Sequence, residues 1–273
     1  MLVWVHQNKK IKVIDVINKT KIGLIGMVTD EMKENFWGTC QKLAEIGYKG
    51  IESTRQLLKG DINENLRKLS KIGLEPVAYS TNKEEIMEDI DQVIENAKKL
   101  EVPHVAIWWG PAESREQLIE DANIYNEAGA KIADANMKLC YHNHEHEFNT
   151  FFDGICAMDI LAEYTDPDKV YFELDCGWIT FGGADPVYIL KKMAGRVPAI
   201  HIKDLKSTEY SDRSSVVFSA VGTGVVKSFE TVKTAIETGV DWVVVEQDRM
   251  RNLTNMETVK VSYLNLKEAG LAQ

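Results

Sequence analysis

The chain has 273 residues and a net charge of −10 at pH 7. That charge argues against nucleic acid or an anionic membrane as the main partner, because both are themselves negatively charged. No uninterrupted apolar run reaches the ~18 residues of a membrane span, and the first twenty residues lack the apolar core of a signal peptide. We therefore expect a cytoplasmic protein whose four cysteines remain reduced.

Eight short apolar runs alternate with longer amphipathic segments. Such runs are typical of parallel strands that are buried on both faces. The predicted strands are Ile22–Met27, Gly50–Glu52, Pro76–Ser80, His104–Trp109, Lys138–His142, Val170–Asp175, Ala199–Lys203 and Trp242–Glu246. The predicted helices are Asn35–Ile46, Asn63–Ile72, Lys83–Leu100, Ser114–Ala135, Ile155–Tyr164, Val187–Ala194, Ser228–Thr238 and Met256–Ala269.

Eight strand-then-helix units without a linker predict an α/β fold, a single-domain (β/α)8 TIM barrel over residues 21–273. Residues 1–20 precede the first strand, and we expect them to form an N-terminal extension packed on the barrel. An open, doubly wound sheet is the alternative. It is less favoured because eight regular units suit closure and no GxGxxG motif follows the first strand.

Polar residues gather where strands five to eight end, which is the end that carries active sites in this fold. His142, Asp175, His201 and Glu246 should converge there on one point. A single histidine or aspartate at a strand end is more often a structural hydrogen-bond partner, but four converging groups favour a site. Two imidazoles and two carboxylates suit Mn²⁺, Co²⁺, Zn²⁺ or Fe²⁺. An ion there could bind two adjacent substrate oxygens and stabilise an enediolate.

Other polar and aromatic residues near the predicted strand ends are candidate substrate contacts. Glu52 ends strand two, although it could equally form a structural ion pair. Trp108 and Trp109 end strand four, where one ring could stack on a sugar face or both could belong to the core. The full set of candidate substrate contacts is Glu52, Trp108, Trp109, Trp178 and Arg249.

Six segments in order resemble the sugar phosphate isomerase/epimerase family of xylose isomerase-like TIM barrels. They are LCYHNHEHEF (139–148), FELDCGW (172–178), GGADPV (182–187), GRVPAIHIKDL (195–205), VGTG (221–224) and VVVEQD (243–248). The resemblance implies one divalent-metal ligand from each of strands five to eight, at His142, Asp175, His201 and Glu246. We expect Mn²⁺, with Co²⁺, Zn²⁺, Fe²⁺ or Mg²⁺ as alternatives.

The chain departs from the ketose 3-epimerases of that family at His142, where those enzymes carry a glutamate. The substitution removes one half of a two-glutamate proton relay, so the catalytic base becomes Glu246, His144 or Glu147. Lys203 would polarise a carbonyl or hold an anionic group. The interval between His201 and Glu246 is also longer than in those enzymes, which implies an insertion around Ser207–Phe218 at the barrel mouth.

The segments TFGGADPV and HIKDLK, with the histidine-rich YHNH, also resemble inosose dehydratase, which eliminates water next to a ketone. Isomerisation and elimination share their first step, the removal of a proton α to a metal-bound carbonyl. We therefore expect a metal-dependent sugar or sugar phosphate isomerase or epimerase. The alternative is a metal-dependent lyase, a dehydratase of inosose or 3-keto-sugar type.

Two further functional classes are less favoured. A non-catalytic metal- or sugar-binding barrel would not need bases beside the metal. An AP-endonuclease-type nuclease would need more histidine ligands and a basic surface. The expected partner is thus a small polyhydroxylated carbonyl substrate, with a homo-oligomer left open. The short GTG turn at 222–224 leaves free and phosphorylated sugars open as well.

Overall fold

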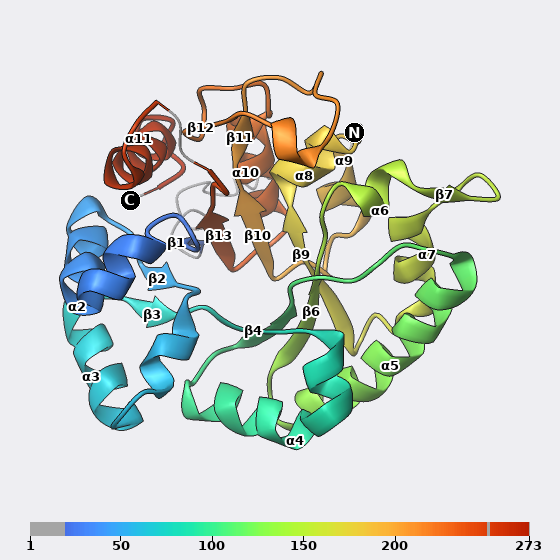
Figure 1. Cartoon of the computed structure of the whole chain (residues 1–273), viewed down its shortest axis with the longest axis horizontal. Helices are drawn as coiled ribbons and strands as arrows, with labels where there is room; N and C mark the ends of the chain where they lie inside the picture. Colours follow the sequence, from blue (N-terminus) through green and yellow to red (C-terminus); the bar gives the residue numbers. More distant parts are fainter. Residues whose placement is uncertain (1–19, 250–251, 273) are drawn as a thin grey trace, which may run out of the picture.

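A computed structural model describes residues 20–249 and 252–272, and in it the predicted barrel is confirmed (Figure 1). Nine strand segments form one parallel sheet in the order β3-β2-β1-β13-β10-β9-β6-β5-β4. Their bounds are β1 Lys21–Leu24, β2 Gly50–Ile51, β3 Glu75–Pro76, β4 Ala78–Thr81, β5 His104–Ile107, β6 Lys138–His142, β9 Val170–Asp175, β10 Ala199–Ile202 and β13 Trp242–Val245. Except for Thr20, the predicted N-terminal extension lies outside the described residues.

The third predicted strand closes the barrel. It divides at Val77 into β3, which pairs with β2, and β4, which pairs with β5. The two end strands of the sheet are therefore consecutive pieces of the chain, and the nine segments are the eight predicted strands. This arrangement brings the C-terminal ends of all the strands to one mouth.

All eight predicted helices are present and surround the strands (Figure 1). They are α2 Thr29–Ile46, α3 Ile62–Ile72, α4 Lys83–Lys99, α5 Arg115–Asp134, α7 Ala157–Tyr164, α9 Pro186–Lys192, α10 Ser228–Glu237 and α11 Asn255–Glu268. None of the described helices has both the length and the apolar character needed to cross a membrane.

Side-chain caps fix where several of these helices begin. Asp61, Asn82 and Ser114 each accept a hydrogen bond from the backbone N–H three residues on, which satisfies a donor that the first helical turn leaves unpaired. Asn35 does the same for Gly38 inside α2, where its backbone leaves the helical conformation. The predicted start at Asn35 is therefore an internal kink, and the helix begins six residues earlier.

Short elements that the sequence did not predict form the rim of the mouth. They follow strand ends and are too short for an apolar periodicity to reveal them. They are the helices η1 Thr54–Leu58, α6 His146–Asn149, α8 Cys176–Phe181 and η2 Arg213–Ser215, and the hairpins β7 Phe151–Phe152 with β8 Ile155–Cys156 and β11 Asp204–Leu205 with β12 Phe218–Ser219. The predicted insertion is the connection between β11 and β12.

The opposite end of the barrel is filled by the Trp242 ring, which lies against two paired glycines. A Cβ added at Gly50 would lie 2.6 Å from that ring and 2.7 Å from Val77, whereas one added at Gly23 would lie 3.4 Å from both. Gly23 and Gly50 are partners in the register of β1 and β2. The two glycines thus face the same ring with different clearance.

We predict that Gly50→Ala lowers the free energy of unfolding by about 1–3 kcal/mol, because a packed ring must move. Gly23→Ala is the matched control and should cost less than about 1 kcal/mol, since its methyl group fits and the unfolded chain loses entropy. Thermal and denaturant unfolding of both variants measure the difference. Equal losses would contradict the packing argument.

His104, at the start of β5, gives acid sensitivity at this end of the barrel. Its side chain is buried, its Nδ1 has no hydrogen-bond partner among the described residues, and burial lowers its pKa to about 4. At pH values below about 6.5, the ordinary pKa of histidine, His104 therefore takes up a proton when the protein unfolds. The stabilisation from the neutral ring is present above that pH and is lost as the pH falls towards 4.

We predict that His104 accounts for roughly 3 kcal/mol of the stability lost between about pH 6.5 and pH 4. His104→Gln should flatten the dependence of unfolding free energy on pH in this window, because glutamine takes up no proton. Urea unfolding at several pH values measures the slope. A variant whose slope matches that of the wild type would refute the assignment.

Candidate active site

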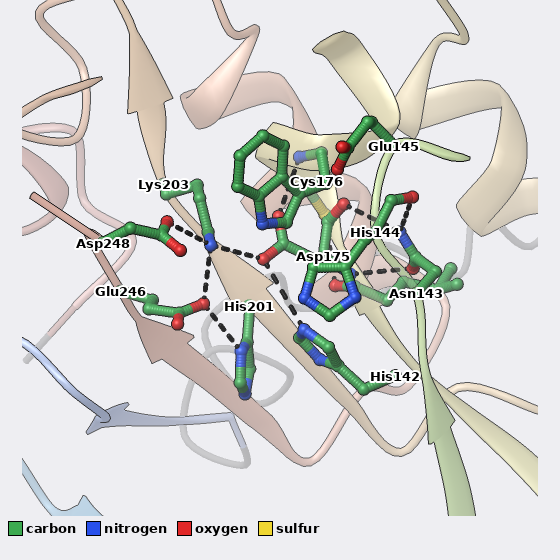
Figure 2. A network of polar contacts seen from close by, with 12 residues as sticks. His142, Asn143, His144, Glu145, Asp175, Cys176, His201, Lys203, Glu246 and Asp248 are labelled. Atoms are coloured by element: carbon green, nitrogen blue, oxygen red, sulfur yellow. Dashed lines mark hydrogen bonds and ion pairs between the residues drawn. The ribbon is translucent and has the colours of Figure 1, made fainter. Parts of the chain in front are cut away.

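The four predicted ligands meet at the mouth of the barrel (Figure 2). His142 and Asp175 end β6 and β9, His201 lies in β10, and Glu246 follows β13. One ligand atom from each side chain lies within 4.8 Å of the others, and all but Glu246 are buried. Two nitrogens and two oxygens that converge in this way fit a divalent transition metal, whose bonds to such atoms are about 2.0–2.2 Å long.

A second pair of carboxylates lies beneath the two histidines. His201 Nε2 is 2.9 Å from Glu52 Oε2 and 3.4 Å from Glu173 Oε2, and His142 Nδ1 is 3.3 Å from the same Glu173 oxygen. Burial opposes a charge on His201, but Glu52, Glu173 and Glu246 outweigh it and raise its pKa. This arrangement leaves His201 Nδ1, which is 3.1 Å from Glu246, and His142 Nε2 facing the cage.

Glu173 was missed by the sequence analysis, although a signal existed. It is the one charged residue inside the apolar run VYFEL, and side chains two apart on a strand share a face, so it points into the barrel like Asp175. It is buried, and the structure assigns it contacts with both imidazoles. A carboxylate that contacts the outer nitrogen of a ligating histidine fixes the orientation of the ring.

Lys203 is held by three carboxylates. Its Nζ lies 2.8 Å from each of Asp175 Oδ2, Glu246 Oε2 and Asp248 Oδ2, and the side chain is 1% exposed. Burial alone would lower the pKa of this amine, but the three carboxylates outweigh burial and raise the pKa. Lys203 therefore remains an ammonium ion beside the predicted ligands, where a charge could stabilise a substrate oxygen.

The two predicted bases after β6 have different surroundings. Glu147 is buried; one of its oxygens accepts from the Tyr141 hydroxyl at 2.7 Å and the other from the His144 backbone N–H at 2.8 Å. This geometry gives Glu147 a role in shaping the loop, and its role as a base stays a prediction. The His144 Nδ1 has no hydrogen-bond partner among the described side chains and backbone, and burial lowers the pKa of its ring, which therefore stays neutral.

The predicted aromatic contacts divide between rim and interior. Trp108 is 51% exposed and Trp109 38%, so neither belongs to the core. The Trp109 ring centroid is 4.9 Å from that of His144. Trp178 is 1% exposed and packs on Phe218 beneath the mouth. Glu52 is in the ion pair that the sequence left open, with His201.

The insertion between β11 and β12 lies over these aromatic rings. The Arg213 guanidinium is 4.4 Å from the centre of the Trp178 ring and 5.5 Å from that of Trp109. Arg249, a predicted substrate contact, instead donates at 2.7 Å to the backbone carbonyls of Ser214 and Arg213. Arg249 thus fastens the insertion, and Arg213, which the sequence analysis did not single out, lies at the mouth.

The GTG turn at 222–224 is occupied by a carboxylate of the protein. The backbone N–H groups of Gly222 and Gly224 each donate to Asp204 Oδ2 at 2.9 Å, and that of Val226 donates to Oδ1 at 2.9 Å. A phosphate group would use such convergent donors. The turn is therefore a brace for the β11 end rather than a phosphate site.

A family model described as xylose isomerase-like TIM barrel matches residues 40–267. The chain belongs to this family. A sugar phosphate isomerase/epimerase from Parabacteroides distasonis ATCC 8503 has a similar structure, with a TM-score of 0.76, 23% identity, and coverage of 93% of this chain and 97% of that one. The IolI protein with a bound zinc atom is also similar, with a TM-score of 0.70, 18% identity, and coverage of 91% and 97%.

Curated relatives include inosose dehydratases. That of Clostridium tetani (strain Massachusetts / E88) is 33% identical over 96 residues, which is 35% of this chain and 31% of the relative. That of Bacillus cereus (strain AH820) is 28% identical over 158 residues, 53% of this chain and 52% of the relative. The similarity thus spans between about a third and a half of the length of these relatives.

We predict that Glu173→Gln weakens Zn²⁺ binding by about 10–100-fold, because both histidines lose the charged partner that orients them. Calorimetric titration of the metal-free protein with ZnCl₂ gives the dissociation constant, and circular dichroism verifies the fold. Glu75→Gln, at the other end of the barrel, is the control and should bind like the wild type. Unchanged affinity in Glu173→Gln would contradict the positioning role.

Proposed function

We propose that this protein is a metal-dependent hydro-lyase, which removes water next to the carbonyl of an inosose or a 3-keto-sugar. The observation that carries the proposal is the end of β6, where His142 stands beside His144, a neutral histidine with an unpartnered nitrogen. An epimerase relay needs a second carboxylate at the position of His142. The inosose dehydratase relatives support the same conclusion.

The proposed metal ligands are His142, Asp175, His201 and Glu246. When bound, a divalent ion would act as a Lewis acid on the substrate carbonyl and acidify the neighbouring C–H bond. The zinc in the IolI structure supports an ion of this kind, and no observation favours Mn²⁺ over zinc. Glu52 and Glu173 would orient the histidines from below.

Two further residues, His144 and Lys203, would carry out the proton transfer and stabilise the charge on the substrate. His144 would take the proton from the α-carbon, which leaves an enolate. The electron pair of the enolate would then form the carbon–carbon double bond as the β-hydroxyl leaves. The same imidazolium would return its proton to that hydroxyl, which departs as water. The Lys203 ammonium would face the charge that develops on the carbonyl oxygen.

The rim favours an unphosphorylated ring. Trp108 and Trp109 are exposed aromatic surfaces suited to the apolar face of a cyclic polyol. The turn at 222–224 has its donors occupied by Asp204. We therefore propose a neutral cyclic substrate that lies against the tryptophans, with its carbonyl directed towards Lys203 and the metal ligands.

A sugar isomerase or epimerase is the second candidate. The Parabacteroides distasonis structure favours it, since the fold and the first step are shared. The two activities differ in the fate of the intermediate, because isomerisation returns a proton to carbon and elimination expels a hydroxyl. A screen in D₂O of inososes, 3-keto-glycosides, ketoses and ketose phosphates with Zn²⁺ or Mn²⁺ therefore separates them.

For an inosose or a 3-keto-glycoside we expect both deuterium exchange and loss of water. NMR spectroscopy and mass spectrometry measure these two changes. His144→Gln should lower turnover by at least about 100-fold, the usual contribution of a general acid–base group, while its metal content stays that of the wild type. Asp175→Ala should lose metal and activity together, because it removes a ligand. Asp241→Asn, at the opposite end of the barrel, is the control.

Exchange without loss of water would favour the second candidate. If no substrate of either class exchanges a proton with metal present, the enolisation chemistry is wrong. If His144→Gln retains full turnover on a substrate that the wild type dehydrates, the dehydratase assignment survives but His144 is not its base.

A further inference from the structure

Lys203 contacts one carboxylate oxygen of each of two proposed metal ligands, Asp175 and Glu246. Its ammonium lies 2.8 Å from Asp175 Oδ2 and 2.8 Å from Glu246 Oε2. Those oxygens in turn face the ring nitrogens His142 Nε2 at 3.9 Å and His201 Nδ1 at 3.1 Å. An ammonium and a divalent ion that share two carboxylates repel each other strongly at low solvent exposure. The site therefore needs a way to hold the ammonium off the metal.

Asp248 is placed to do this. It follows β13 two residues after Glu246, and its Oδ2 lies 2.8 Å from Lys203 Nζ. Figure 2 shows Asp248 on the side of the ammonium away from Asp175. Asp248 does not belong to the cluster of four that could hold the ion. Asp248 is thus a carboxylate partner of Lys203 that is not a proposed metal ligand.

The charges of Lys203 and its three carboxylate partners support the same assignment, in which Asp248 binds the ammonium and Asp175 and Glu246 bind the metal. Asp175, Glu246 and Asp248 with the Lys203 ammonium leave two net negative charges, which one divalent ion neutralises. Without Asp248 a single negative charge would remain for the ion, and the buried ammonium would have Asp175 and Glu246 as its carboxylate partners. A buried ammonium is costly without a partner, so Lys203 would then compete with the metal directly.

We propose that Asp248 is a positioning residue, which keeps a carboxylate on the Lys203 ammonium when a metal takes Asp175 and Glu246 as ligands, and which thereby sets the metal affinity of the site. This inference rests on the metal site of the proposed function. In this proposal Asp248 changes the metal affinity through its contact with Lys203, and not by adding to the negative electrostatic potential of the mouth. The two actions differ in one respect: only the first disappears when Lys203 is removed.

A double-mutant cycle on the full chain tests this difference. The probe is Zn²⁺ alone, added to chelator-stripped protein at fixed pH and ionic strength, with a chromophoric chelator as competitor. We expect Asp248→Asn to weaken Zn²⁺ binding by about tenfold or more. Lys203→Met should bind at least as tightly as the wild type, and the double variant should bind like Lys203→Met.

Matched variants make each outcome decisive. Asp241→Asn, at the opposite end of the barrel, should leave the affinity unchanged. Asp248→Glu keeps the carboxylate and should retain most of the affinity, and Lys203→Gln takes the place of Lys203→Met in the cycle if Lys203→Met does not fold. Equal weakening by Asp248→Asn with and without Lys203, or no weakening at all, would overturn the proposal. A wild-type protein that binds no stoichiometric Zn²⁺ would overturn the metal site itself.

Discussion

The polar cluster at the mouth depends on mutual compensation of buried charge. Two imidazoles, one ammonium and several carboxylates lie there with little access to water, and each would be costly if it were alone. Lys203 contacts three carboxylates, while His201 lies between Glu52 below and Glu246 above. Each of the five carboxylates in the cluster lies within contact distance of a lysine or histidine nitrogen.

The barrel supplies the geometry that makes such compensation feasible. Parallel strands in register place Asp175 beside His201, because these residues are partners between β9 and β10. Closure through β3 and β4 brings Glu52, at the end of β2, to the same ring. An open sheet would leave the end of β2 far from β10, and His201 would lack the carboxylate that contacts its Nε2.

The rim of the mouth is also held by contacts between polar groups of the protein itself. Asp204 binds the backbone of the turn at 222–224, so the return strand of the insertion is anchored beside β11. Arg249 donates to the carbonyls of the insertion and holds Arg213 over Trp178. Asp204 and Arg249, which resemble ligand-binding groups in the sequence, thus shape the mouth through contacts within the protein.

The sequence by itself determined the eight strands, the eight helices and the convergence of His142, Asp175, His201 and Glu246. Those features depend on local patterns, namely apolar runs and the polar residue that ends each run. Only the tertiary structure decided the contacts of Glu52, Glu173, Asp248 and Arg213, because those contacts join distant parts of the chain; the Glu52–His201 contact spans 149 positions. No periodicity encodes such a partner, since it is selected by closure of the barrel and by the need of each buried charge for an opposite one.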